Sequence, residues 1–473
     1  MAVLGGCSLA PTYRTPPTAP PPPSYREVGT WKQAEPADAP ARGPWWNIFQ
    51  DPALDALESH VSASNQDLKA ALARLEEARA QTRIARAAYF PTVTGNASAT
   101  RERQSVNSPT YNSLKPGIFN DFQLEADVSY EFDVFGRVRS NVAAARASQQ
   151  ASAADLAVLD LSTHAELATD YFTLRSDDAE AELLDHTVAD YERALQLTEN
   201  LYNGGAAPLS DLEQARAQVA TAKTQAADIR LRRAQTEHAI AVLLGEQAST
   251  FRIDPAPLPA DVTPAPVDPG LPSALLERRP DVAGAERLVA AANARIGVAR
   301  AAYFPVFSLA AVAGFESTAA SNWISAPSRL WSLGPSGVLT LFDAGLHRAQ
   351  SANAHALYDE QVADYRGTVL TAYQEVEDNL AALRELEKES VSEAAAVAAT
   401  QSALEQAEYR YKGGIVTYLE VVTEENAALS ARLSATDIQM RRMNATVLLV
   451  KALGGGWENP LASSTAQPPP QAP

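Results

Sequence analysis

The side chains that most often carry out chemistry in proteins are few in this chain, and they lie far apart in the sequence. Its only cysteine is Cys7, so no disulfide can form within the chain. No metal-binding, phosphate-binding or nucleophile motif surrounds the histidines or any other candidate residue. We therefore expect no catalytic residue, no metal site, no cofactor and no enzymatic activity. The six histidines are His60, His164, His186, His238, His347 and His355.

Cys7 itself lies in a pattern that predicts a modification. Residues 4–7 read LGGC, the pattern of a bacterial lipobox whose cysteine is acylated, and the Pro-rich sequence beyond them cannot bury a thiol. The charged and apolar regions of a full signal peptide are missing, so we expect a truncated start. We also expect that Met1–Gly6 are absent from the mature protein. Pro11–Pro44 would then form a semi-extended tether between the lipid and the folded body.

The composition excludes one class of partner. The chain has 39 Lys and Arg residues against 57 Asp and Glu residues, which gives a formal net charge of −18. Such an acidic chain repels phosphate backbones, so we expect no nucleic-acid partner. Hydrophobic residues make up 46% of the chain, enough for a folded core. No apolar run reaches about 18 residues, so the sequence predicts no transmembrane helix.

Acidic side chains are concentrated on one face of a predicted β-strand. In the segment DFQLEADVSYEFD, residues 121–133, apolar and polar residues alternate strictly, which is the period of a strand with two unlike faces. The acidic side chains of the polar face are Glu125, Asp127 and Glu131. The apolar face consists of Phe122, Leu124, Ala126, Val128, Tyr130 and Phe132.

Long helices account for most of the remaining chain. Leu54 to Ile84 follow a helical period, with Asp51 and Pro52 as the expected start and Pro91 beyond the end. Residues 136–202 contain no proline, which predicts a helix of about 100 Å. A further helix is expected from about Leu209 to Leu244, after a Gly- and Pro-containing turn.

The chain contains the same pattern twice. The sequence ARAAYFP occurs at Ala85–Pro91 and again at Ala299–Pro305. EFDVFGR and YNGG in the first half match LFDAGLH and YKGG in the second, in the same order. The sequence therefore predicts two copies of one unit: helix, two strands, long helix, turn and helix. The expected divisions are a lipobox and tether (1–44), a first repeat (45–249), a Pro-rich crossing linker (250–270), a second repeat (271–456) and a disordered polar tail (457–473).

Four strands with one apolar face cannot form a closed sheet alone, so their edges would stay unpaired. Membrane-spanning barrels begin at eight strands, which two copies of the chain would supply, and three copies would supply twelve. The Ala-rich helices are too long for a compact globule and are suited to antiparallel coiled-coil packing. An elongated coiled-coil protein without a channel remains an alternative on the helices alone, and the alternating strands argue against it.

Together these motifs resemble the TolC family of outer-membrane efflux ducts. They are ARAAYFP twice, YEFDVFGRVRS, LFDAGLHRAQ, LYNGGAAPLSDLEQARAQV and YRYKGGIVTYLEVVTEENAAL, and the resemblance extends from Trp45 to Gly456. The lipobox is typical of the lipoprotein branch, which contains OprM-like and NodT-like proteins. The resemblance implies a homotrimer whose four strands per chain form one shared twelve-stranded barrel. It also implies a periplasmic helical tunnel that docks a periplasmic adaptor and an inner-membrane pump of the RND type.

The resemblance also suggests functional residues at the two helix–helix turns. Asp211 and Tyr411 match an Asp and a Tyr whose hydrogen bond helps to hold the family's periplasmic tip shut. Ser210 matches the hydroxyl partner of a second latch, but Val416 stands where that latch has an arginine. Glu420 matches an acidic constriction position, where three copies could form a carboxylate ring or where it could be one more solvated charge. The glycines expected to shape the turns and dock the adaptor are Gly204, Gly205, Gly413 and Gly414.

The sequence therefore predicts a lipid-anchored outer-membrane exit duct with a periplasmic extension. It would passively conduct drugs or other small molecules from an adaptor and pump to the exterior. Two alternatives remain open: an exit duct for polypeptides in type I secretion, and a non-conducting periplasmic coiled-coil scaffold.

Overall fold

The computed structural model describes residues 9–28, 44–109, 117–259, 267, 269–270 and 272–457. The prediction for Cys7, with its lipobox, lies outside the described residues. The described residues divide into two compact units. We call one the strand unit; it is drawn from Met1–Pro17, Arg74–Ala153 and Gly284–Arg366. We call the other the helical unit; it is drawn from Thr18–Ala73, Ala154–Ala283 and Gly367–Pro473.

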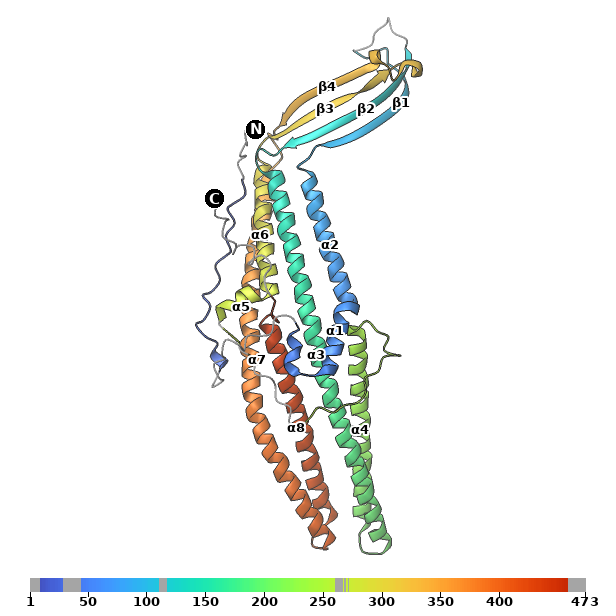
Figure 1. The fold of residues 1–473 in the computed structure, drawn as a ribbon, viewed down its shortest axis with the longest axis vertical. Helices are drawn as coiled ribbons and strands as arrows, with labels where there is room; N and C mark the ends of the chain where they lie inside the picture. Colours follow the sequence, from blue (N-terminus) through green and yellow to red (C-terminus); the bar gives the residue numbers. More distant parts are fainter. Residues whose placement is uncertain are drawn as a thin grey trace, which may run out of the picture. The chain divides into compact units, whose positions relative to one another are not determined.

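The elements repeat in the order that the duplicated motifs predict (Figure 1). In the first copy, α2 (Gln66–Ala87) precedes β1 (Thr92–Arg103), β2 (Ile118–Phe132), α3 (Arg137–Asn203) and α4 (Leu209–Leu243). In the second, α6 (Pro280–Ala301) precedes β3 (Val306–Ser317), β4 (Arg329–Val338), α7 (Leu346–Lys412) and α8 (Tyr418–Ala452). The helices α3 and α7 each have 67 residues, and α4 and α8 each have 35. These equal lengths confirm the two structural repeats.

The described strands form one antiparallel sheet in the order β1-β2-β3-β4 (Figure 1). Its register places Val93, Val128, Ala311 and Leu333 side by side across all four strands, on one face. The next row, on the opposite face, contains Thr94, Asp127, Val312 and Ser332. Since neighbouring residues of a strand point to opposite faces, the sheet has one apolar face and one mostly polar face, as the alternation predicts. The edges of the sheet are β1 and β4.

The start of the first repeat differs from the prediction of one continuous helix. Two helices are present instead, α1 (Pro52–Ser64) and α2, and Asn65 separates them. The Asn65 side chain accepts a hydrogen bond from the Leu68 amide at 2.9 Å and donates to the Leu243 carbonyl at 2.8 Å. Asn65 therefore caps α2 and ties this break to the end of α4, which a helical period along one segment could not reveal.

A second difference concerns β4. The segment GPSGVLTLFDAG, residues 334–345, indicates a short strand by its sequence, whereas the observed strand extends from Arg329, which pairs with Phe315, to Val338. The described residues also include a short helix before α6, namely α5 (Pro272–Arg278), and four 3-10 turns. Those turns are η1 (Arg26–Val28), η2 (Trp45–Phe49), η3 (Ala320–Asn322) and η4 (Ala326–Ser328).

The core of the helical unit lies where α1 meets α3, α4 and α8. One cluster joins Leu54 of α1 to Phe172 of α3 and Val447 of α8, all with at most 2% of their surface exposed. A second joins Val61 of α1 to Leu174 of α3 and Ile240 of α4, each fully buried. Asp51 starts α1 by accepting hydrogen bonds from the amides of Ala53 and Leu54. This short helix therefore fastens three of the long helices together through apolar burial.

Candidate functional site

The two predicted turns have the same backbone geometry. The amide of Ala206 donates to the Leu201 carbonyl at 2.8 Å, and the amide of Ile415 donates to the Arg410 carbonyl at 3.0 Å. Gly205 and Gly414 have φ values of +75° and +70°, in the left-handed region that residues with a Cβ atom rarely adopt. Both α3 and α7 therefore end in a Schellman motif. Gly204, Gly205, Gly413 and Gly414 are all exposed, so the turns present bare backbone to their surroundings.

Within the single chain, Tyr411 and Asp211 are not joined by a hydrogen bond. The hydroxyl of Tyr411 is buried and has no hydrogen-bond partner among the described residues. Its ring packs against Tyr418, with the ring centroids 5.4 Å apart. The carboxylate of Asp211 accepts a hydrogen bond from the hydroxyl of Ser210 at 3.3 Å. The latch between Tyr411 and Asp211 therefore remains a prediction for the assembled protein.

Glu420 lies in the first turn of α8 and forms an ion pair with Arg410 at the end of α7. A carboxylate at this end of a helix is also stabilised by the helix dipole. The guanidinium partner partly neutralises the charge that a ring of three Glu420 side chains would present. Arg410 is a functional candidate that the sequence motifs did not identify, although it lies one residue before Tyr411.

An aspartate caps the helix at each strand-to-helix junction. The carboxylate of Asp133 accepts hydrogen bonds from the amides of Val138 and Arg139, both at 2.9 Å. The carboxylate of Asp343 accepts from the amides of Gly345 and His347 at 2.8 and 2.9 Å. These bonds satisfy amides at the starts of α3 and α7 that have no partner within the helix.

The acidic side chains of β2 have neighbours that are positively charged or polar. Glu131 forms an ion pair with Arg137, and this contact raises the pKa of the guanidinium group. Asp127 accepts a hydrogen bond from the side chain of Asn96 on β1. Glu125 pairs in register with Asn96 and with Gly314.

Two buried polar clusters of the helical unit were not predicted from the sequence. The first is a pair: His164 of α3 lies 2.5 Å from the carboxylate of Glu58 on α1. The Trp46 ring stacks on the imidazole with centroids 4.5 Å apart. Glu58 and His164 are 106 positions apart in the sequence, so no local pattern indicates their contact.

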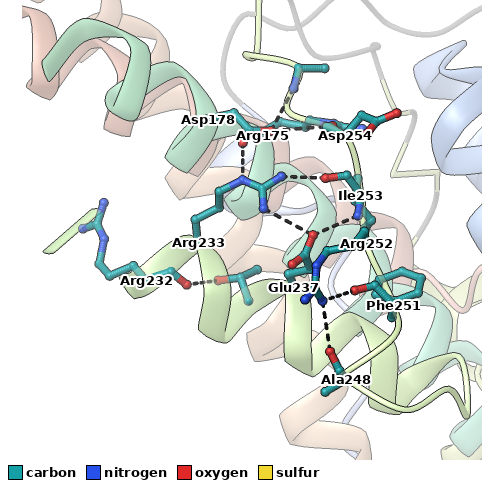
Figure 2. A network of polar contacts seen from close by, with 12 residues as sticks. Arg175, Asp178, Arg232, Arg233, Glu237, Ala248, Phe251, Arg252, Ile253 and Asp254 are labelled. Atoms are coloured by element: carbon teal, nitrogen blue, oxygen red, sulfur yellow. Dashed lines mark hydrogen bonds and ion pairs between the residues drawn. The ribbon is translucent and has the colours of Figure 1, made fainter. Parts of the chain in front are cut away.

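The second cluster holds the segment that follows α4 (Figure 2). Asp178 of α3 accepts from Arg233 Nε at 2.6 Å, from Arg175 Nη1 at 3.2 Å and from the Ala256 amide at 3.0 Å. Arg233 also donates to the Ile253 carbonyl, and Glu237 accepts from the Ile253 amide at 2.8 Å. Both carboxylates are almost fully buried, so each depends on these partners for its stability.

No described part of the chain contains three or more His, Cys, Asp or Glu side chains arranged to hold a metal ion. Among the described helices, none combines the length and the apolar character needed to cross a membrane.

The fold and its turns define a class of protein before any relative is considered: a duplicated chain in which long paired helices are joined to a four-stranded antiparallel sheet with unlike faces. The model of the family described as "Outer membrane efflux protein" matches this chain twice, over residues 57–246 and 271–455. The chain therefore belongs to the outer membrane efflux protein family. The two matches correspond to the two structural repeats.

Curated relatives extend over nearly the whole chain. A "Toluene efflux pump outer membrane protein TtgC" from Pseudomonas putida is 36% identical over 458 residues, covering 96% of this chain and 94% of its own length. An "Antibiotic efflux pump outer membrane protein ArpC" from the same species is also 36% identical with the same coverage. These relatives, with the family match, make this chain an outer-membrane efflux channel protein and not an enzyme.

Solved structures agree with this assignment. The outer-membrane channel OprN superposes with a TM-score of 0.87 at 32% identity, covering 95% of this chain and all of its own (100%). The open state of the MtrE outer membrane channel from Neisseria gonorrhoeae superposes with a TM-score of 0.82 at 27% identity, covering 96% and 99% of the two chains.

Proposed function

We propose that three copies of this chain form one conduit and that the conduit releases small organic molecules to the exterior. The observation that carries this proposal is the sheet, whose edge strands β1 and β4 have no partner on their outer sides within the described chain. Long unpaired edges are normally covered or paired in native proteins, because their free amides and carbonyls invite further strands. Three copies joined edge to edge would close a sheet of about twelve strands.

The faces of the sheet support the same arrangement. Trp331 and Leu333 of β4 are 78% and 63% exposed, and Val93 of β1 is 64% exposed, all on the apolar face. Apolar side chains at such exposure favour a lipid environment. The polar face with Glu125, Asp127 and Glu131 would then line the lumen and favour cations.

The partners and the gate are proposed from the family. We propose that a periplasmic adaptor docks on the bare turns at Gly204–Gly205 and Gly413–Gly414, and that an RND-type pump supplies the energy. Asp211 and Tyr411 would hold the tip shut at rest. Acylation of Cys7 would add a lipid anchor in the outer membrane. The names of the relatives, which mention toluene and antibiotics, favour small molecules over polypeptides as cargo.

The proposal is tested by restoring efflux in cells that lack their own outer-membrane channel. We expect the chain, expressed with its pump and adaptor, to restore toluene tolerance and to lower the accumulation of a fluorescent drug. A variant with Trp331→Asp and Leu333→Asp, which places charges on the apolar face, should fail to insert and to restore efflux. Correctly inserted wild-type trimers that leave drug accumulation unchanged would contradict the proposal.

A further inference from the structure

The helical unit contains a cavity near the ends of α3 and α7 that the conduit does not explain. It has a volume of about 380 Å³, within the range of sites that bind small molecules. Its walls come from three helices: Tyr191 and Asp190 from α3, Glu408 and Tyr411 from α7, and α8 on the remaining side. The cavity belongs to one chain and lies within one compact unit.

Three tyrosines line this cavity, and the hydroxyl groups of Tyr191, Tyr411 and Tyr418 have no hydrogen-bond partner among the described residues. Tyr418 is only 2% exposed, and its hydroxyl makes no hydrogen bond to any described residue. The hydroxyl of Tyr411 has no partner either. A buried polar group without a hydrogen bond destabilises the fold, so such groups normally bind a ligand or water. With Tyr191, these residues give the cavity three aromatic rings, whose faces attract cations.

The cavity also holds a carboxylate without a cation. Oxygen Oε2 of Glu425 is buried and accepts no hydrogen bond from the described residues. Burial, together with the negative charges of Glu408 and Asp190, raises the pKa of Glu425 to about 7. Lys412 is 3.1 Å from Glu408, and Arg193 forms an ion pair with Asp190, so the cations of the wall are already engaged.

The remaining cation of the wall does not serve Glu425. Arg432 lies two helical turns farther along α8, and it donates a hydrogen bond to Gln401. The Oε2 atom of Glu425 is therefore a buried carboxylate oxygen without a positive partner in the described chain, and it lines the same cavity as three phenol rings. Tyrosine rings around one carboxylate form the arrangement that recognises organic ammonium groups.

We propose that this cavity binds a small organic cation of the ammonium class. The ammonium group would lie on the carboxylate of Glu425 and donate to the hydroxyls of Tyr418 and Tyr411. Its apolar part would pack against the ring of Tyr191. A divalent metal ion is not the expected ligand, because no described cluster has three metal-binding side chains. The cavity has room for a group larger than an ammonium ion alone.

The proposal is tested by calorimetric titration of the intact purified protein with benzylammonium chloride at pH 8. Benzyl alcohol, a neutral molecule of the same shape, is the matched probe. We expect saturable binding of benzylammonium, with one site per chain and an affinity at least about tenfold higher than that of benzyl alcohol. Equal affinities for the two probes, or no saturable binding of benzylammonium, would overturn the proposal.

Variants test whether the ligand binds in this cavity. Glu425→Gln keeps the shape of the side chain and should lower the affinity about tenfold, and Tyr418→Phe should lower it about threefold. Glu424→Gln, which changes the next residue on α8, should alter it less than twofold. Size-exclusion chromatography establishes that each variant assembles like the wild type. An unchanged affinity in both Glu425→Gln and Tyr418→Phe would place the ligand elsewhere and overturn the proposal.

The pH dependence gives an independent measurement. Because the pKa of Glu425 is about 7, its carboxylate is mostly ionised at pH 8 and mostly protonated at pH 6. The affinity for benzylammonium should fall about tenfold between these values, since only the ionised form binds the cation well. The Glu425→Gln variant should show no such change. The same fall in the variant would mean that another group controls binding.

Discussion

The imidazole of His164 and the carboxylate of Glu58 meet in the interior of the helical unit, with Nδ1 of the ring 2.5 Å from Oε2. Their side chains are 4% and 0% exposed. Ser62 and Asp160 lie at the other ring nitrogen, 3.1 and 3.6 Å away. Since Glu58 lies on α1 and His164 on α3, the contact fastens the short helix to a long one by charge as well as by apolar packing.

This pair predicts that stability decreases at alkaline pH. Burial lowers the pKa of His164, but the hydrogen bonds and charges of Asp160 and Glu58 outweigh burial and raise it from 6.5 to about 9. The folded protein therefore keeps a proton that the unfolded chain loses above pH 6.5. The contribution of His164 to the free energy of unfolding should be complete below pH 6.5 and be lost as pH rises to about 9. Thermal unfolding at pH 6 and pH 9 measures this.

The matched control is His164→Gln, which removes the titrating group. Its unfolding temperature should be lower at pH 6 and should change less between pH 6 and pH 9 than that of the wild type. Equal pH dependence in the two proteins would show that His164 does not hold the extra proton.

The cluster around Asp178 predicts a large effect of one substitution. Asp178→Ala leaves Arg233 and Arg175 without their shared carboxylate in the interior, which should destabilise the protein by about 3–5 kcal/mol. Asp185→Ala is the control, because Asp185 pairs with Arg230 on an exposed surface and should cost less than about 1 kcal/mol. Denaturation in guanidinium chloride compares the two. Similar losses of stability in both variants would mean that the buried ion pairs of Asp178 stabilise the fold no more than an exposed ion pair does.

The ion pair between Arg410 and Glu420 predicts a change in ion selectivity. If three Glu420 side chains face the conduit, Arg410→Gln frees their charge and should increase the preference for cations about two- to fivefold. Glu420→Gln should decrease it. Reversal potentials of reconstituted channels under a salt gradient measure the effect. Unchanged selectivity in both variants would indicate that Glu420 is an ordinary solvated charge.

At the two turns, the role of the glycines in the backbone conformation can be tested separately from their proposed role in adaptor docking. Asn tolerates the left-handed conformation of Gly205 and Gly414 and adds a side chain to the bare surface. A Gly205→Asn, Gly414→Asn double variant should assemble normally and should bind the adaptor at least about tenfold more weakly. Binding of the purified adaptor to immobilised protein measures this. Adaptor binding as strong as that of the wild type would show that the turns are not part of the docking surface.

Much of the fold was predictable from local patterns, and the exceptions have physical causes. The alternation in β2 and the repeated motifs identify the faces of the sheet and the duplication. At the end of α1, the side chain of Asn65 donates a hydrogen bond to the Leu243 carbonyl, a contact that the sequence period of one helix cannot reveal. The segment GPSGVLTLFDAG indicates β4 only from Gly334 onward, yet pairing with β3 extends the strand back to Arg329.

The candidate site was predictable only where a motif marks it. Gly205 and Gly414 were found because the two turns repeat the same letters, and the structure gives both the same geometry. Glu58, His164 and Asp178 were missed because their partners lie on other helices. The cavity at Glu425 was missed for the same reason: its walls come from α3, α7 and α8, and each wall residue alone resembles an ordinary helix position.

The most direct test of the channel account is conductance of the purified trimer in a planar lipid bilayer, comparing the wild type with the double variant Tyr411→Phe, Asp211→Ala. We predict discrete cation-preferring steps in the wild type and larger or more frequent steps in the variant, because loss of the proposed latch opens the tip. Conductance steps of equal size and frequency in both proteins would rule out the latch but would still support the channel. Well-folded, inserted trimers that conduct no ions in either form would contradict the account.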